Sequence, residues 1–171
     1  MGVWRGFGCA RSLALLLPML LLTGCATLPS EKIVLRIRDW KTERIHVETP
    51  AKVGSRFVFA WIHSQEKIPW NEYYHVDEAL RLVLDTITFP AFGAGIPEDK
   101  GRITSIRNGL IHMDEIAQPF TELVWLNSHT ATRELMLDGV CIGRGSELPE
   151  HTRLRLTVES AGNPANSKNR Q

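Results

Sequence analysis

The sequence predicts an all-β protein, a single antiparallel sandwich or barrel of about eight to ten strands with little helix after residue 24. Two features predict this fold class. Apolar and polar residues alternate along most of the chain, as they do in strands that bury one face. Turn-forming residues recur about every eight to twelve positions, in stretches such as TPAKVG, PEDKG, RNG and GRG. This spacing is typical of antiparallel sheets.

The alternation is clearest at the two ends of the expected domain. KIVLRIRDW (32–40) and RLRLTVE (153–159) each place aliphatic side chains on one face and mostly polar side chains on the other. ELVWLNS (122–128) is a further short apolar run. We expect all three segments to be strands.

ELMLDGVCIG (134–143) is the clearest hairpin in the chain. Asp138 and Gly139 separate two apolar arms, and this pair of residue types readily adopts the positive φ angles of a two-residue turn. VDEALRLVLDTI (76–87) is the one segment that also fits a helix, because Asp77 would cap it. Its leucines alternate at every second position, however, which favours a strand.

WIHSQEKIPWNEYYHV (61–76) is the densest group of polar and aromatic side chains. It predicts a hairpin with a strand over 55–64, a loop over 65–70 and a return strand over 71–76. The hairpin would bring these side chains together at one end of a sheet.

The register of this hairpin decides which side chains meet. A loop centred between residues 67 and 68 places Trp61 opposite Tyr74, and His63 opposite Glu72, on one face. A slip of one residue would move the last two side chains to opposite faces. The first register predicts a histidine oriented by a carboxylate.

The expected His63–Glu72 pair has two interpretations. In the functional one it forms a polar site at the mouth of the sandwich; in the structural one Glu72 accepts hydrogen bonds that hold the turn. Zinc is disfavoured, because Glu72 and His75 project to opposite faces and a distant third ligand, such as His112 or His129, would be needed. We therefore assign no catalytic residue, no metal ligand and no cofactor.

The first 24 residues have the pattern of a signal peptide. Arg5 and Arg11 precede an apolar run, Leu13 to Leu22, that is too short to span a bilayer. LLTGC (21–25) resembles the lipobox of bacterial lipoproteins, which implies cleavage before Cys25 and lipidation of its thiol. An ordinary secretory signal that happens to contain a cysteine is the alternative.

The lipobox resemblance also implies a location. Lipid on Cys25 would anchor the protein in the cell envelope, facing the periplasm. Ala26 follows in place of an aspartate, which resembles outer-membrane sorting more than inner-membrane retention. We expect a lipidated tether over 25–31, one all-β domain over 32–159 and a disordered tail over 160–171.

Composition limits the partners of the mature chain, whose expected length is 171 − 24 = 147 residues. Without Arg5 and Arg11 it has 20 − 2 = 18 basic residues against 19 acidic ones, and no basic stripe. Nucleic acid is therefore a poor candidate partner. Cys141 would be the only free thiol, so no internal disulfide is expected.

Two motifs carry a family resemblance. HSQEKIPWNEYY (63–74), followed by FGAGIP (92–97), resembles the bacterial family called domain of unknown function 1850, over about residues 33–158. The corresponding positions are His63, Ser64, Glu66, Pro69, Glu72, Tyr74, Gly93, Ala94, Gly95 and Pro97. Gln65 and Trp70 depart from the pattern. The candidate binding residues are these corresponding positions without Ala94, together with Trp70.

FGAGIPEDKG (92–101) also has two physical interpretations. Gly93 and Gly95 permit backbone conformations closed to other residues, and successive amides there would cradle an anion. The alternative is a bulge and turn that leave the preceding strand, with Pro97 starting the next turn. Base rates for strand glycines favour the second interpretation.

The resemblance implies an accessory protein beside a tripartite ATP-independent periplasmic transporter. The expected function is therefore a lipid-anchored extracytoplasmic accessory or binding module, whose partner is a transporter subunit or a periplasmic receptor. Two alternatives remain open. One is a hydrolase-like or metal-assisted envelope enzyme that uses His63 and Glu72; the other is a structural envelope lipoprotein.

Overall fold

The computed structural model describes residues 1–2, 32–97 and 99–162. The expected signal peptide, Cys25 and the tether up to residue 31 lie outside the described residues. So do residues 163–171 of the expected tail.

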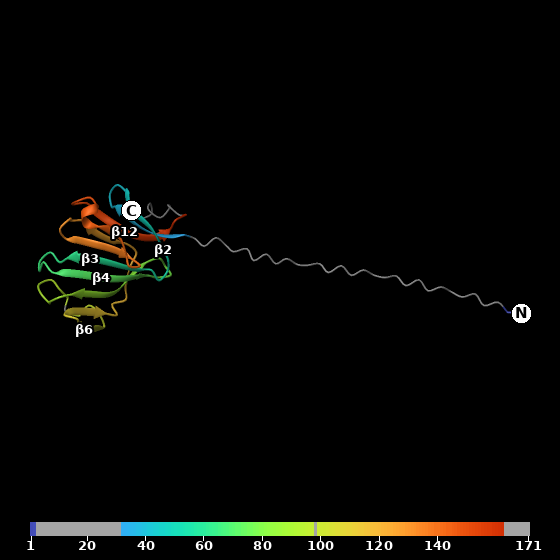
Figure 1. Ribbon diagram of the computed structural model, residues 1–171, viewed down its shortest axis with the longest axis horizontal. Coiled ribbons are helices and arrows are strands. Elements are labelled where there is room, and N and C mark those ends of the chain that lie inside the picture. Colours follow the sequence, from blue (N-terminus) through green and yellow to red (C-terminus); the bar gives the residue numbers. More distant parts are fainter. Residues whose placement is uncertain (3–31, 98, 163–171) are drawn as a thin grey trace.

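The described chain forms a sandwich of two antiparallel sheets (Figure 1). The smaller sheet has the strand order β2 (Ile45–Ala51), β1 (Ile33–Asp39), β12 (Arg153–Ser160), β9 (Leu123–Leu126). The larger has the order β11 (Val140–Arg144), β10 (Thr132–Leu137), β3 (Arg56–Ile62), β4 (Pro69–Val76), β5 (Leu82–Phe89), β7 (Leu110–Asp114), β6 (Ile103–Arg107). β8 (Gln118–Phe120) pairs with β5, and a single 3-10 turn, η1, covers Gly145–Glu147.

This architecture confirms the predicted all-β class. The sheets do not close into a barrel, and the described residues contain twelve strands, more than the eight to ten expected. Part of the excess is β8, a strand of three residues that is too short to show an alternating pattern.

The smaller sheet joins the two ends of the domain. β1 pairs along its whole length with β12, so the first strand (blue) and the last strand (red) lie side by side in Figure 1. Their alternating aliphatic residues point into the sandwich as predicted, and Leu35, Ile37, Leu154 and Leu156 are fully buried. The core is therefore closed by residues far apart in the sequence.

The turn predicted at Asp138 and Gly139 is confirmed. Both residues have positive φ, 49° and 82°, as a two-residue hairpin turn requires. The Asp138 carboxylate also accepts hydrogen bonds from the Ser55 hydroxyl (2.9 Å) and the Arg56 amide (2.8 Å). The β10–β11 turn is therefore tied to the start of β3.

The segment after Asp77 is a turn and a strand, as the alternation favoured. The Asp77 carboxylate accepts hydrogen bonds from the amides of Ala79 (3.0 Å) and Arg81 (2.8 Å). It therefore organises a turn instead of capping a helix, and β5 begins at Leu82.

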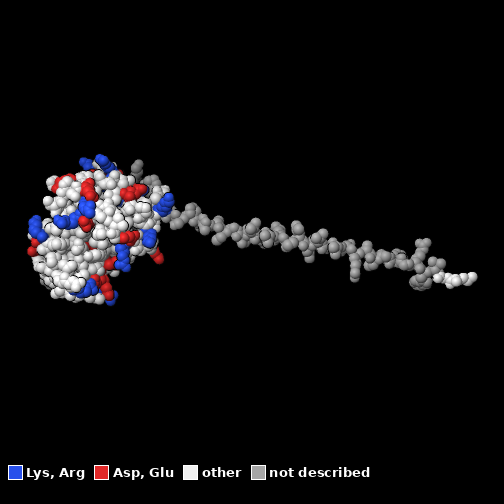
Figure 2. Space-filling model, viewed as in Figure 1, with Lys and Arg blue, Asp and Glu red and all other residues white. Residues whose placement is uncertain are grey.

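Charges of both signs are interspersed on the surface. Over the described residues on the face shown in Figure 2, no area of one sign dominates. On the outer face of the smaller sheet, Arg36 joins Glu48 and Glu159, and Arg38 also pairs with Glu159. No helix among the described residues is long and apolar enough to cross a bilayer.

Candidate functional site

The β3–β4 hairpin has a different register from the one expected. Trp61 lies opposite Trp70, and Phe59 lies opposite Glu72. The predicted pairing of Trp61 with Tyr74 is therefore wrong. The chain reverses earlier than expected: Lys67, with φ 57°, donates its amide to the His63 carbonyl and closes a tight turn.

Because of this shift, His63 and Glu72 are not cross-strand partners, and the predicted pair is wrong. Each side chain keeps its expected sheet face, since the pairing moved by an even number of residues. The His63 ring packs against the rings of Trp61 and Trp70, with centroids 5.7 and 5.6 Å apart. Its amide bonds to the carbonyl of Ile68.

Glu72 is held by its neighbours on the same strand. The Trp70 indole N–H donates to Oε1 (3.1 Å), and the Tyr74 hydroxyl donates to Oε2 (2.6 Å). Residues two apart on a strand share a face, so all three side chains point toward the smaller sheet. Burial and the Glu72 carboxylate raise the pKa of Tyr74 far above its usual 10.0, and Tyr74 remains a hydrogen-bond donor.

Glu72 lines a pocket of about 440 Å³ between the two sheets. β3 and β4 form one wall, and β9 with the segment leading into it forms the other. Five aromatic side chains line the pocket: Phe59, Trp61, Tyr74, Phe120 and Trp125. Most of the other lining residues are aliphatic, and Glu72 and Glu122 are the two acidic ones. A mostly apolar cavity with a few polar groups is the usual form of a small-molecule site.

The second wall contains a polar group without a partner. The indole nitrogen of Trp125 is buried and makes no hydrogen bond within the described protein. The Trp125 ring packs on Phe59, with centroids 5.2 Å apart. No local pattern predicts this role, because Trp125 is 53 positions (125 − 72) from Glu72 and on another sheet.

The two motifs of the family resemblance lie against each other. The Ala94 amide donates to Oε1 of Glu66 (2.7 Å), so the glycine-rich loop binds an anion that the protein itself supplies. A Cβ on Gly93 would lie 2.5 Å from Cδ of Glu66, and one on Gly95 would lie 2.6 Å from Oε1 of Gln65. Both glycines therefore allow the loop to approach the β3–β4 turn closely.

Of the remaining candidate residues, only Ser64 lines the pocket. Ser64 is exposed and lines the pocket, and Pro69 opens β4. Pro97 is exposed next to the buried Ile96. Trp70 is only 5 % exposed and stacks on Phe89 at 4.8 Å, so it belongs to the core and only its N–H serves the site.

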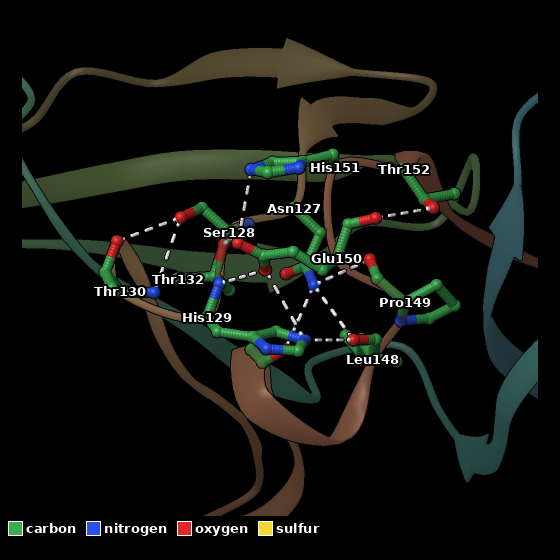
Figure 3. Close-up of polar contacts among 11 residues, drawn as sticks. Asn127, Ser128, His129, Thr130, Thr132, Leu148, Pro149, Glu150, His151 and Thr152 are labelled. Carbon is green, nitrogen blue, oxygen red and sulfur yellow. Dashed lines mark hydrogen bonds and ion pairs between the residues drawn. The ribbon is translucent and has the colours of Figure 1, made fainter.

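A second polar cluster joins two of the connections between the sheets, β9 to β10 and β11 to β12 (Figure 3). Asn127, which is fully buried, donates through its carboxamide to the carbonyls of Gly145 (3.0 Å), Leu148 (3.2 Å) and Pro149 (3.0 Å). Asn127 follows β9 and these acceptors precede β12, so the cluster braces the ends of neighbouring strands. Its role is structural.

The residues of a hydrolase triad are not assembled in this cluster. The Ser128 hydroxyl bonds to that of Thr130 (3.1 Å), and Nε2 of His129 bonds to the Leu148 carbonyl (2.9 Å). His75 lies on the outer face of the larger sheet beside Asp85 (2.8 Å), away from Glu72 as its spacing predicted. The described residues contain no group of three His, Cys, Asp or Glu side chains placed to hold a metal.

The fold and the pocket define a class, a β-sandwich with an aromatic, acidic cavity between its sheets. Residues 57–143 match the family model described as Domain of unknown function (DUF1850), and the chain belongs to this family. This confirms the resemblance over a shorter range than the 33–158 expected. No curated protein and no solved structure matches the chain.

Proposed function

We propose that this protein is a lipid-anchored extracytoplasmic binding module whose ligand occupies the pocket between the sheets. One observation carries the proposal: the pocket has aromatic walls and an oriented carboxylate, Glu72, that no protein cation within the described residues neutralises. Such a cavity can enclose and orient a small molecule.

Binding is favoured over hydrolysis by the way in which Glu72 is held. Two donors fix its carboxylate on the wall of the pocket. One of them, the Tyr74 hydroxyl, is a group that can act as a nucleophile, but burial and the Glu72 charge raise the pKa of Tyr74 and keep this hydroxyl protonated.

The anchor and the transporter partner are supported by the sequence. LLTGC resembles a lipidation signal, and the resemblance of HSQEKIPWNEYY and FGAGIP to the family implies the association with a tripartite transporter. The Cys25→Ala variant tests the anchor: we expect the protein to move from the membrane fraction to the soluble fraction. Equal membrane recovery of wild type and variant would contradict lipid anchoring at Cys25.

The partner is sought with a photoreactive residue at Gln65. Gln65 is exposed beside the glycine-rich loop, whereas Trp70 is too buried to contact another protein. Crosslinking in native membranes should yield a transporter subunit or a periplasmic receptor. Absence of a specific product from abundant, folded protein would contradict the accessory role.

The ligand site is tested by placing a bulky side chain at the rim. Ser64→Trp would obstruct the pocket at an exposed position, and Ser146→Trp is a matched exposed control outside it. Small molecules that copurify with the native protein are measured by mass spectrometry. We expect a compound retained by wild type and by the control but lost from Ser64→Trp; equal retention by all three, or no retained compound, would contradict the proposal.

A further inference from the structure

The geometry points to the chemical class of the ligand: a small organic ammonium ion that also carries a hydrogen-bond acceptor. This inference rests on the proposed function, because it concerns the same pocket. The ammonium group would lie against Glu72 among the aromatic rings, and the acceptor would reach the indole N–H of Trp125.

The charge of the pocket supports a cation. Two carboxylates line it, Glu72 and Glu122. Arg155 lies 3.7 Å from Glu122, whereas no Lys, Arg or His of the described residues forms an ion pair with Glu72. Glu72 is half-buried, and its partners, Trp70 and Tyr74, are neutral donors. A carboxylate taken partly out of water is stabilised by an opposite charge, which the ligand can supply.

The aromatic walls favour the same charge. The faces of aromatic rings carry negative potential and attract cations, including quaternary ammonium groups, most strongly where water is excluded. Five such rings surround the pocket in which Glu72 lies. A ligand carboxylate would be repelled by Glu72 and by the ring faces, and a neutral apolar ligand would desolvate Glu72 without compensating it.

Trp125 is the reason to expect a hydrogen-bond acceptor on the ligand. A buried N–H without a partner is unfavourable, and the indole nitrogen of Trp125 is one. Trp125 lines the pocket but its indole nitrogen is covered there, so an ester, hydroxyl or ether oxygen of the ligand accepts this hydrogen bond once the ring turns toward the cavity. The proposed ligands therefore differ from simple amines, which lack the acceptor, and from apolar compounds, which lack the positive charge.

A matched pair of probes tests the inference on the full chain. Acetylcholine carries a quaternary ammonium group and an ester; 3,3-dimethylbutyl acetate has the same shape without the charge. Binding is followed by NMR through the indole N–H signals of Trp61 and Trp125, assigned with Trp→Phe variants. We expect acetylcholine to bind at least about tenfold more tightly than the neutral ester.

Two variants assign the effect to one carboxylate. Glu72→Gln should weaken acetylcholine binding about tenfold and leave binding of the neutral ester unchanged, since Gln keeps an acceptor for Trp70 and Tyr74. Glu122→Gln, in the same pocket, should weaken acetylcholine binding less than Glu72→Gln does, because Arg155 lies beside Glu122 as well as Glu43, whereas Glu72 has no cationic partner among the described residues. If Glu72→Gln fails to fold, the comparison of the two probes on the wild-type protein still tests whether the pocket prefers a cation.

Three outcomes would overturn the inference. Equal binding of both probes would show that the pocket takes ligands without regard to charge, which leaves the proposed function standing. Stronger binding of an anion such as hexanoate would reverse the assigned charge. No indole shift with any probe at millimolar concentration would also overturn it, and the Ser64→Trp experiment would then decide the proposed function separately.

Discussion

Glu72 owes its environment to the residues two positions before and after it. Trp70 and Tyr74 share its sheet face, and each donates a hydrogen bond to one carboxylate oxygen. This local triplet follows from strand periodicity and was available from the sequence, because the period of two decides which side chains are neighbours. The partners of Glu72 are therefore on its own strand, and the cross-strand partner expected for it, His63, is wrong.

Tyr74 provides the first prediction. Burial and the Glu72 charge raise its pKa in the folded protein, so its contribution to stability is present below pH 10 and is lost as the pH rises further. We expect the tyrosinate absorbance that Tyr74→Phe removes to appear only together with unfolding. Ionisation of this residue in a folded protein, judged by near-ultraviolet circular dichroism, would contradict the assigned hydrogen bond.

Glu66 provides a second prediction at this scale. Its carboxylate is the acceptor for the Ala94 amide, 28 positions away. Glu66→Ala should accelerate hydrogen exchange of that amide by about tenfold or more, because the loop loses its tie to the β3–β4 turn. Glu66→Gln, which keeps an acceptor, should change the exchange rate of the Ala94 amide much less. Unchanged exchange in Glu66→Ala would show that the contact does not hold the loop.

At the scale of elements, Asn127 connects the ends of β9 and β12. Its carboxamide donates to three backbone carbonyls in a fully buried position. Asn127→Ala should lower the free energy of unfolding by about 1–3 kcal/mol, measured with urea, because the Pro149 carbonyl loses its donor and the Gly145 and Leu148 carbonyls each lose one of two. Asn71→Ala is the control, since half-buried Asn71 makes one side-chain bond, to Thr88 (3.2 Å). A similar loss in both variants would contradict a special role for Asn127.

The outer face of the smaller sheet predicts a pH effect. Burial raises the pKa of Glu159, but hydrogen bonds and charge from Arg38 and Arg36 outweigh it and hold the pKa below the usual 4.5. A lowered pKa contributes stability above the unfolded value, and this is lost as the pH falls.

The matched variant for this effect is Glu159→Gln. The stability difference between wild type and this variant should be largest at about pH 7 and shrink below about pH 4. Glu78→Gln, at an exposed position, is the control. A difference that does not change with pH would show that the arginines do not act through the Glu159 charge.

The register of β3 and β4 shows what limits sequence analysis at this scale. Both strands and the face of each side chain were predicted, because alternation determines them. The position of the turn depended on Lys67 adopting positive φ, a conformation that its side chain does not favour. The predicted partners were therefore wrong: Trp61 was expected opposite Tyr74 and lies opposite Trp70, four residues earlier. The sheet face of each side chain was nevertheless right.

For the whole molecule, the fold depends on its last strand. β12 lies between β1 and β9, and its Leu154 and Leu156 are fully buried in the core. A chain that ends at Thr152 should lack a dispersed amide spectrum and cooperative unfolding, because β9 loses its partner in the smaller sheet and β1 loses one of its two. The control chain ends at Gly162. Cooperative unfolding of the shorter chain would show that the larger sheet folds alone.

The sequence by itself determined the class of fold, most strands, the tight Asp138–Gly139 turn and the family. These depend on residues close in the chain: alternation, turn chemistry and short motifs. Only the tertiary structure decided the β3–β4 pairing, the contact of Glu66 with the glycine-rich loop, and the pocket. The pocket brings Glu72 on one sheet to Trp125 on the other, and contact between sheets is set by packing of distant strands, which no local pattern encodes.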